Sequence, residues 1–148
     1  MLFFIVFNMK KYAIMIFAVM LLAMTSAVYS IDFDSSQIQG LNITTDVDGA
    51  LNMAKSENKT VMMVFDQDSC VYCDMFKKDV LSNPDVQNVL SEKCIVLFVD
   101  INKHPDIANK YKVFGTPSTQ FLDSNGKEIT KVEGYVGADE FLNTLKEI

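Results

Sequence analysis

Two cysteines separated by two residues are the feature of this sequence that most directly suggests chemistry. Cys70 and Cys73 follow an apolar stretch and open a segment with helical spacing, in which Phe76 and Val80 share a face with Cys73. Residues three apart on a helix have Cβ atoms about 5–6 Å apart, close enough for their sulfurs to form a disulfide. The pair can therefore open and close as a redox couple without refolding of the domain.

The two cysteines are expected to have different roles because they occupy different places on the helix. Cys70 lies at the N-terminus, where unpaired N–H groups and the helix dipole favour a thiolate. Cys73 lies one turn further along, on the apolar face, and is expected to be less accessible. We predict that Cys70 is the exposed catalytic nucleophile and that Cys73 is the catalytic residue that resolves the mixed disulfide.

Other interpretations of the cysteines remain open at this stage. The pair can be a purely structural disulfide, although closing so short a loop contributes little stability. It can be half of a metal site, but zinc requires about four ligands, and the sequence offers one histidine, His104, and no second pair of this spacing. We therefore expect no metal and no cofactor besides the redox-active disulfide. Cys94 lies in an apolar stretch and is expected to be a small buried hydrophobic residue.

Four segments have the composition of strands. Continuous apolar runs at residues 60–65 and 94–99 predict two strands that are buried on both faces of a parallel sheet. Residues 118–122 and 128–132 predict two more, joined by a turn that contains Asn125-Gly126. A short strand is also expected around residues 41–43. The predicted sheet is therefore mixed.

Helical spacing separates these strands. Thr45 and Asp48 form a capping-box pattern ahead of a helix that continues to Asn58. Further helices are expected at residues 70–82 and 85–90, after Pro105, and from Ala138 onward. Alternation of strands and helices implies parallel pairing with right-handed crossovers. The economical interpretation is one α/β domain covering residues 45–148.

In this order of elements, residues 45–148 resemble the thioredoxin superfamily. The cysteine pair follows a buried strand, and Gly115-Thr116-Pro117 precedes the hairpin and the last helix. The resemblance implies a thioredoxin-like three-layer sandwich with a mixed central sheet and flanking helices. It also implies that Pro117 is cis and faces the disulfide, and that the backbone of Thr116 pairs with an extended substrate. Val71 and Tyr72, between the cysteines, are further candidate substrate-binding residues.

Within that superfamily the sequence is most similar to the C-terminal domain of transmembrane thiol:disulfide interchange reductases. The similarity lies in Cys70-Val71, Phe76-Lys77 and the Asn-Pro-Asp-Val run at residues 83–86. The chain departs from thioredoxins proper because Val64 stands where they have a buried aspartate. Asp66 lies two residues further along, on the same side of the strand, and is a candidate proton relay for Cys73.

The N-terminus is predicted to be an export signal. Lys10 and Lys11 precede an apolar run at residues 12–24, and small residues follow, so residues 1–30 are assigned to a signal peptide with cleavage after Ser30. An uncleaved N-terminal membrane anchor is the alternative. Residues 31–44 are then a linker. Either way the domain is expected in the periplasm or another extracytoplasmic compartment, where disulfides persist.

Charge limits the partners. The 148 residues include no arginine and carry a net charge of −6, which makes nucleic acid an improbable ligand. The expected partners are exported protein thiols or disulfides and a membrane electron donor, with the protein acting as a monomer. No histidine separates the cysteines, and nearby aspartates such as Asp68 and Asp74 oppose a thiolate, so we expect a reductase or isomerase rather than a strong oxidase. A non-catalytic peptide-binding module of the same fold is the alternative.

Overall fold

The computed structural model describes Ile38 and residues 40–148. The expected signal peptide at residues 1–30 lies outside the described residues, as does most of the expected linker. In the described part of the chain, no helix is both long enough and apolar enough to cross a membrane.

A five-stranded sheet with the order β1-β3-β2-β4-β5 forms the centre of the fold. Strand β2 pairs parallel with β3 and antiparallel with β4, which confirms the mixed sheet. The central positions of β2 and β3 follow from their apolar side chains on both faces. The strands are β1 (Ile43–Thr44), β2 (Thr60–Asp66), β3 (Cys94–Asp100), β4 (Ser118–Leu122) and β5 (Glu128–Glu133).

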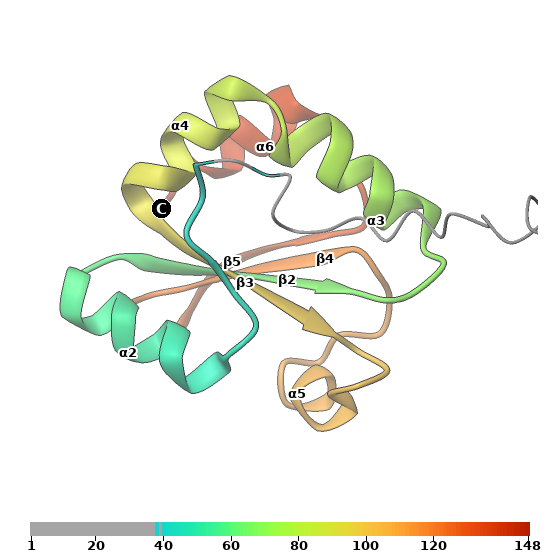
Figure 1. The fold of residues 1–148 in the computed structure, drawn as a ribbon, viewed down its shortest axis with the longest axis horizontal. Coiled ribbons are helices and arrows are strands. Elements are labelled where there is room, and N and C mark those ends of the chain that lie inside the picture. The colour runs from blue at the N-terminus through green and yellow to red at the C-terminus, as the bar shows by residue number, and fades with distance from the viewer. Residues whose placement is uncertain (1–37, 39) are drawn as a thin grey trace, which may run out of the picture. The chain divides into compact units, whose positions relative to one another are not determined.

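Helices cover both faces of the sheet, so the expected three-layer sandwich is confirmed. Figure 1 shows α3, α4 and α6 on one face and α2 and α5 on the other. The helical elements are α2 (Val47–Glu57), α3 (Val71–Met75), the π-helix η2 (Phe76–Leu81), α4 (Pro84–Lys93), α5 (Pro105–Lys110) and α6 (Ala138–Thr144).

Strand alternation divides the apolar residues into two cores. Met62 and Val64 of β2 pack in the core beneath η2, α4 and α6, whereas Met63 and Phe65 pack in the core beneath α2 and α5. Because side chains two apart on a strand share a face, Asp66 lies on the same side as Val64. The strand therefore directs Asp66 toward the layer that contains α3 and η2.

Two details of the helices differ from the sequence-based expectation. The N-cap of α2 is Asp46, not Thr45, because Asp46 has extended backbone angles and its carboxylate accepts a hydrogen bond from the N–H of Gly49 at 3.1 Å. The segment expected as one helix at residues 70–82 is α3 followed directly by the π-helix η2. A π-helical turn of this kind often lies at a functional site.

Candidate active site

A tight loop delivers the first cysteine from the sheet to a helix. β2 ends at Asp66, and four residues later Cys70 forms the N-cap of α3 with φ −95° and ψ 96°. Ser69, just before it, has φ +60°, which is uncommon for a residue other than glycine and turns the chain sharply. This turn sets Cys70 at the N-terminus of α3, as the sequence predicts.

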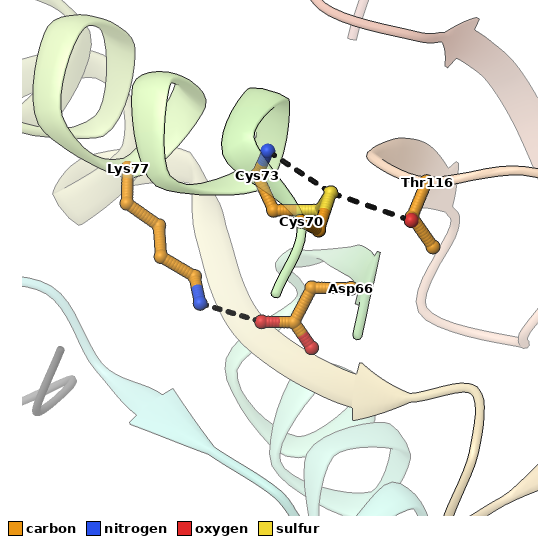
Figure 2. The surroundings of a disulfide bond; sticks show 5 residues. All are labelled: Asp66, Cys70, Cys73, Lys77 and Thr116. Carbon is orange, nitrogen blue, oxygen red and sulfur yellow. Dashed lines mark hydrogen bonds and ion pairs between the residues drawn. A yellow bond between two sulfur atoms is a disulfide. The ribbon is translucent and has the colours of Figure 1, made fainter. Parts of the chain in front are cut away.

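Cys70 and Cys73 form a disulfide with a Cα–Cα distance of 5.2 Å (Figure 2). The Sγ of Cys70 accepts a hydrogen bond from the backbone N–H of Cys73 at 3.2 Å. The hydroxyl of Thr116 donates a second hydrogen bond to the same sulfur at 3.4 Å. Two donors directed at one sulfur favour a negative charge on it after reduction.

The expectation that Cys70 is exposed is wrong. Cys70 retains only 9% of its surface, against 2% for Cys73. The N-cap conformation turns its sulfur back over the first turn of α3, and Thr116 from another loop contacts it there. The order of accessibility is as predicted, with Cys73 the deeper residue.

The loop before β4 provides the opposite wall of the site. The Thr116–Pro117 peptide bond is cis, the isomer that the resemblance implies. Neither the main-chain N–H nor the C=O of Thr116 is hydrogen-bonded to another described residue. The N–H of Gly134 donates to the carbonyl of Pro117 at 2.9 Å, which joins the loop to the end of β5. A pocket of about 260 Å³ lies here, lined by residues 113–118, 133 and 134.

Exposed apolar side chains lie between the two cysteines in the sequence and along the pocket. Val71 and Tyr72, expected as substrate contacts, are both exposed, and the ring of Tyr72 lies 6.4 Å from that of Tyr135, which follows Gly134 of the pocket. Phe114 lines the pocket with 90% of its surface exposed and was not among the residues predicted from the sequence. The sequence feature that could have indicated it is a large apolar residue directly before Gly115-Thr116-Pro117.

The candidate relay Asp66 is in an ion pair. Its carboxylate lies 2.6 Å from the ammonium of Lys77, and both side chains are mostly buried. The Lys77 ammonium also lies 5.5 Å from the centre of the Phe98 ring. Lys77 was not among the site residues predicted from the sequence, although its position four residues after Cys73 places it on the same face of the helix.

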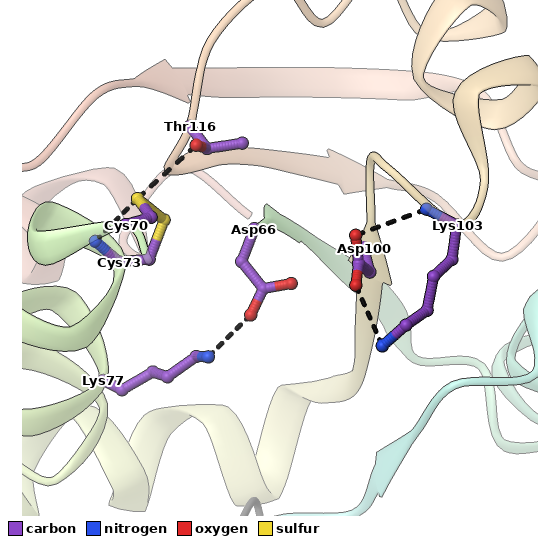
Figure 3. A network of polar contacts seen from close by, with 7 residues as sticks. All are labelled: Asp66, Cys70, Cys73, Lys77, Asp100, Lys103 and Thr116. Carbon is purple, nitrogen blue, oxygen red and sulfur yellow. Dashed lines mark hydrogen bonds and ion pairs between the residues drawn. A yellow bond between two sulfur atoms is a disulfide. The ribbon is translucent and has the colours of Figure 1, made fainter. Parts of the chain in front are cut away.

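A second ion pair lies on the next strand (Figure 3). Asp100 is the register partner of Asp66 and lies 3.0 Å from the ammonium of Lys103. Desolvation raises the pKa of Asp100, but hydrogen bonds from the Lys103 side chain and from the N–H groups of Asn102 and Lys103 outweigh it and hold that pKa below its usual value.

The remaining candidate residues lie apart from the disulfide. Cys94 begins β3 and is buried, and desolvation raises its pKa to about 12, so it behaves as the apolar residue that was expected. His104 is exposed at the N-cap of α5. Within residues 40–148, no cluster of three or more histidine, cysteine or acidic side chains is arranged to hold a metal.

Comparison with known proteins supports the same fold. Residues 47–148 match the family described as thioredoxin-like domain. The chain is 33% identical over 102 residues to the thiol:disulfide interchange protein DsbD of Actinobacillus pleuropneumoniae, covering 65% of this chain and 17% of that protein. For DsbD of Tatumella citrea the identity is 32% over 122 residues, covering 77% of this chain and 21% of that protein. The chain thus spans about a fifth of these relatives.

Solved structures give the same result. A thioredoxin from Thermus thermophilus matches with a TM-score of 0.66 and 28% identity, covering 73% of this chain and 86% of that one. The reduced C-terminal domain of Neisseria meningitidis DsbD matches with a TM-score of 0.59 and 25% identity, covering 70% of this chain and 96% of that domain. With its mixed sheet and its helix-capping cysteine pair, the chain belongs to the thioredoxin-like domain family.

Proposed function

We propose that this thiol:disulfide oxidoreductase is exported and acts mainly as a reductase or isomerase of protein disulfides. The disulfide-exchange activity in this proposal rests on the environment of the Cys70 sulfur, which accepts hydrogen bonds from the backbone N–H of Cys73 and the hydroxyl of Thr116. Such donors stabilise a thiolate, which is the reactive form of cysteine in disulfide exchange.

The reaction begins with the reduced protein. The Cys70 thiolate attacks one sulfur of a substrate disulfide, so that a Cys70–substrate bond forms and the other substrate sulfur leaves as a thiolate that takes up a proton. Cys73 then loses its proton and attacks the Cys70 sulfur. The Cys70–Cys73 disulfide forms, the second substrate thiol is released, and the substrate has gained two electrons.

The surroundings of the disulfide favour a protein substrate. The free main-chain groups of Thr116 can pair with an extended segment in the manner of strand addition. The exposed side chains of Val71, Tyr72 and Phe114 can contact apolar residues on either side of the substrate cysteine.

The direction of electron flow and the location follow from other features. Asp68 and Asp74 carry negative charge close to the pair, and no histidine lies between the cysteines to stabilise a thiolate further. The apolar N-terminal segment supports export, and the similarity to DsbD supports a membrane protein as the electron donor. A reduction potential near −120 mV, typical of a strong oxidase, would contradict the reductive assignment.

A cysteine-dependent turnover assay tests the proposal. Insulin reduction coupled to glutathione should be lost in Cys70→Ser and retained in Cys94→Ala, a matched variant that removes the buried third cysteine. Cys73→Ser should accumulate mixed disulfides with its substrates, because their resolution needs the second sulfur. Equal activity of wild type and Cys70→Ser would instead favour a peptide-binding module.

A further inference from the structure

The ion pair between Asp66 and Lys77 lies beside the inner cysteine of the disulfide. Lys77 follows Cys73 by four residues, so both side chains lie on one face of the continuous helical segment formed by α3 and η2. The two charged groups are 2.6 Å apart, and their side chains are only 15% and 17% exposed. Figures 2 and 3 show Asp66 next to the disulfide with its carboxylate turned toward Lys77.

A charge close to a thiol changes how readily that thiol ionises. A partly buried charge is screened less by solvent than one on the surface, and a nearby carboxylate opposes a thiolate whereas an ammonium favours it. Asp66 alone would therefore hinder the loss of the Cys73 proton. Lys77 is the cation in direct contact with that carboxylate and offsets its charge.

The other charged groups around Asp66 do not take this role. Asp100, on the neighbouring strand, is paired with Lys103 at 3.0 Å. The Lys103 side chain is 70% exposed and directs its ammonium to Asp100, with weaker electrostatic interactions with Asp68 and Asp66. Asp74 on α3 is exposed to solvent.

We propose that Lys77 is a positioning residue for the resolving step of the reaction. It holds the Asp66 carboxylate beside Cys73 and offsets its negative charge, so that Asp66 can accept the proton without preventing the thiolate from forming. This inference rests on the proposed function. In the mixed disulfide the Cys73 proton passes to Asp66, the Cys73 sulfur bonds to Cys70, the Cys70–substrate bond breaks, and the departing substrate thiolate takes up a proton.

Loss of either charge of the ion pair is expected to shift the ionisation of Cys73, in opposite directions for the two residues. Both losses are expected to slow the resolving step. Loss of the Lys77 charge should raise the pH at which the Cys73 thiol ionises, and loss of the Asp66 charge should lower it, each by about one pH unit. The resolving step should slow about tenfold in both cases, because one variant loses the offsetting cation and the other loses the proton acceptor. A purely structural ion pair would not produce opposite shifts.

Ultraviolet absorbance of the thiolate as a function of pH measures the equilibrium part. It is recorded in a Cys70→Ser background for Lys77→Met, Asp66→Asn and Lys77→Arg. Cys94 does not interfere because burial raises its pKa to about 12. Lys78→Met is the matched control, since Lys78 is an exposed lysine on the same helical segment. The kinetic part is the release of the second equivalent of aromatic thiol when reduced protein with both cysteines reacts with an aromatic disulfide.

Opposite shifts for Lys77→Met and Asp66→Asn, with wild-type behaviour of Lys77→Arg and Lys78→Met, support the proposal. Shifts of the same sign, no shift, or failure of Lys77→Arg to restore the wild-type curve overturn it. If Lys77→Met does not fold, Asp66→Asn decides alone, and a shift to higher pH or no shift rejects the proposal. The absorbance curve needs no turnover, so failure of the insulin assay would reject the proposed function without affecting this result.

Discussion

The hydrogen bond from Thr116 to the Cys70 sulfur provides a quantitative test of how the site activates its nucleophile. Thr116→Val removes the hydroxyl donor and keeps the shape of the side chain. A hydrogen bond to a charged acceptor contributes about 1.5–3 kcal/mol, and the 3.4 Å contact here belongs at the low end of that range. About 1.4 kcal/mol corresponds to one pH unit. We therefore expect the ionisation of Cys70 to move about one pH unit higher.

Alkylation of Cys70 as a function of pH, in a Cys73→Ser background, measures this effect. Thr116→Val should react about tenfold more slowly than the Thr116 protein at neutral pH and at the same rate at high pH, where the thiol is fully ionised in both. Thr116→Ser keeps the hydroxyl and is the matched control, expected to follow the Thr116 curve. If Thr116→Val also follows that curve, the hydroxyl does not stabilise the thiolate. If Thr116→Ser shifts as far as Thr116→Val, the effect comes from packing.

Three further predictions concern the supporting structure. Phe141→Ala should destabilise the protein by about 3–5 kcal/mol in denaturant unfolding, because its buried ring packs against Phe76 and Phe121 at centroid distances of 5.2 and 5.9 Å. Cys94 should resist alkylation in the native protein at neutral pH and react only in denaturant, since it is buried with a pKa of about 12. The folded pKa of Asp100 is lowered, so its stabilising contribution is present above pH 3.8 and is lost in acid; the advantage of wild type over Asp100→Asn in urea unfolding should shrink as the pH falls below that value.

The elements predicted correctly from the sequence are those for which a local pattern is compatible with one structure. The continuous apolar runs of β2 and β3 indicate strands in the centre of the sheet, with both faces covered by helices. Asn125-Gly126 indicates the turn between β4 and β5, where Gly126 has φ +81°. The spacing of Cys70 and Cys73 likewise fixed their position on one helical turn. These features depend on residues close together in sequence, which is why they can be read locally.

Contacts between distant segments were harder to foresee. The burial of Cys70 depends on Thr116, which is 46 residues away in the chain. The exposure of Phe114 depends on the backbone path between α5 and the cis peptide bond at Pro117, whereas its apolar side chain alone suggests burial. The ion pair between Asp66 and Lys77 could not be predicted without the structure, because it depends on η2 continuing α3 and bringing Lys77 close to the end of β2.

The position of the acid on β2 explains why a lysine is useful at this site. A carboxylate at position 64 would lie in the apolar core, where Val64 is fully buried, and desolvation would strongly favour its neutral form. Asp66 lies two residues, about 6–7 Å, further along the same strand face, at the edge of that core. There it is partly hydrated and adjoins a cation, so a charged carboxylate is tolerated close to the disulfide. A carboxylate at position 66 can therefore carry a negative charge that burial at position 64 would disfavour, and the ammonium of Lys77 lies close enough to offset that charge.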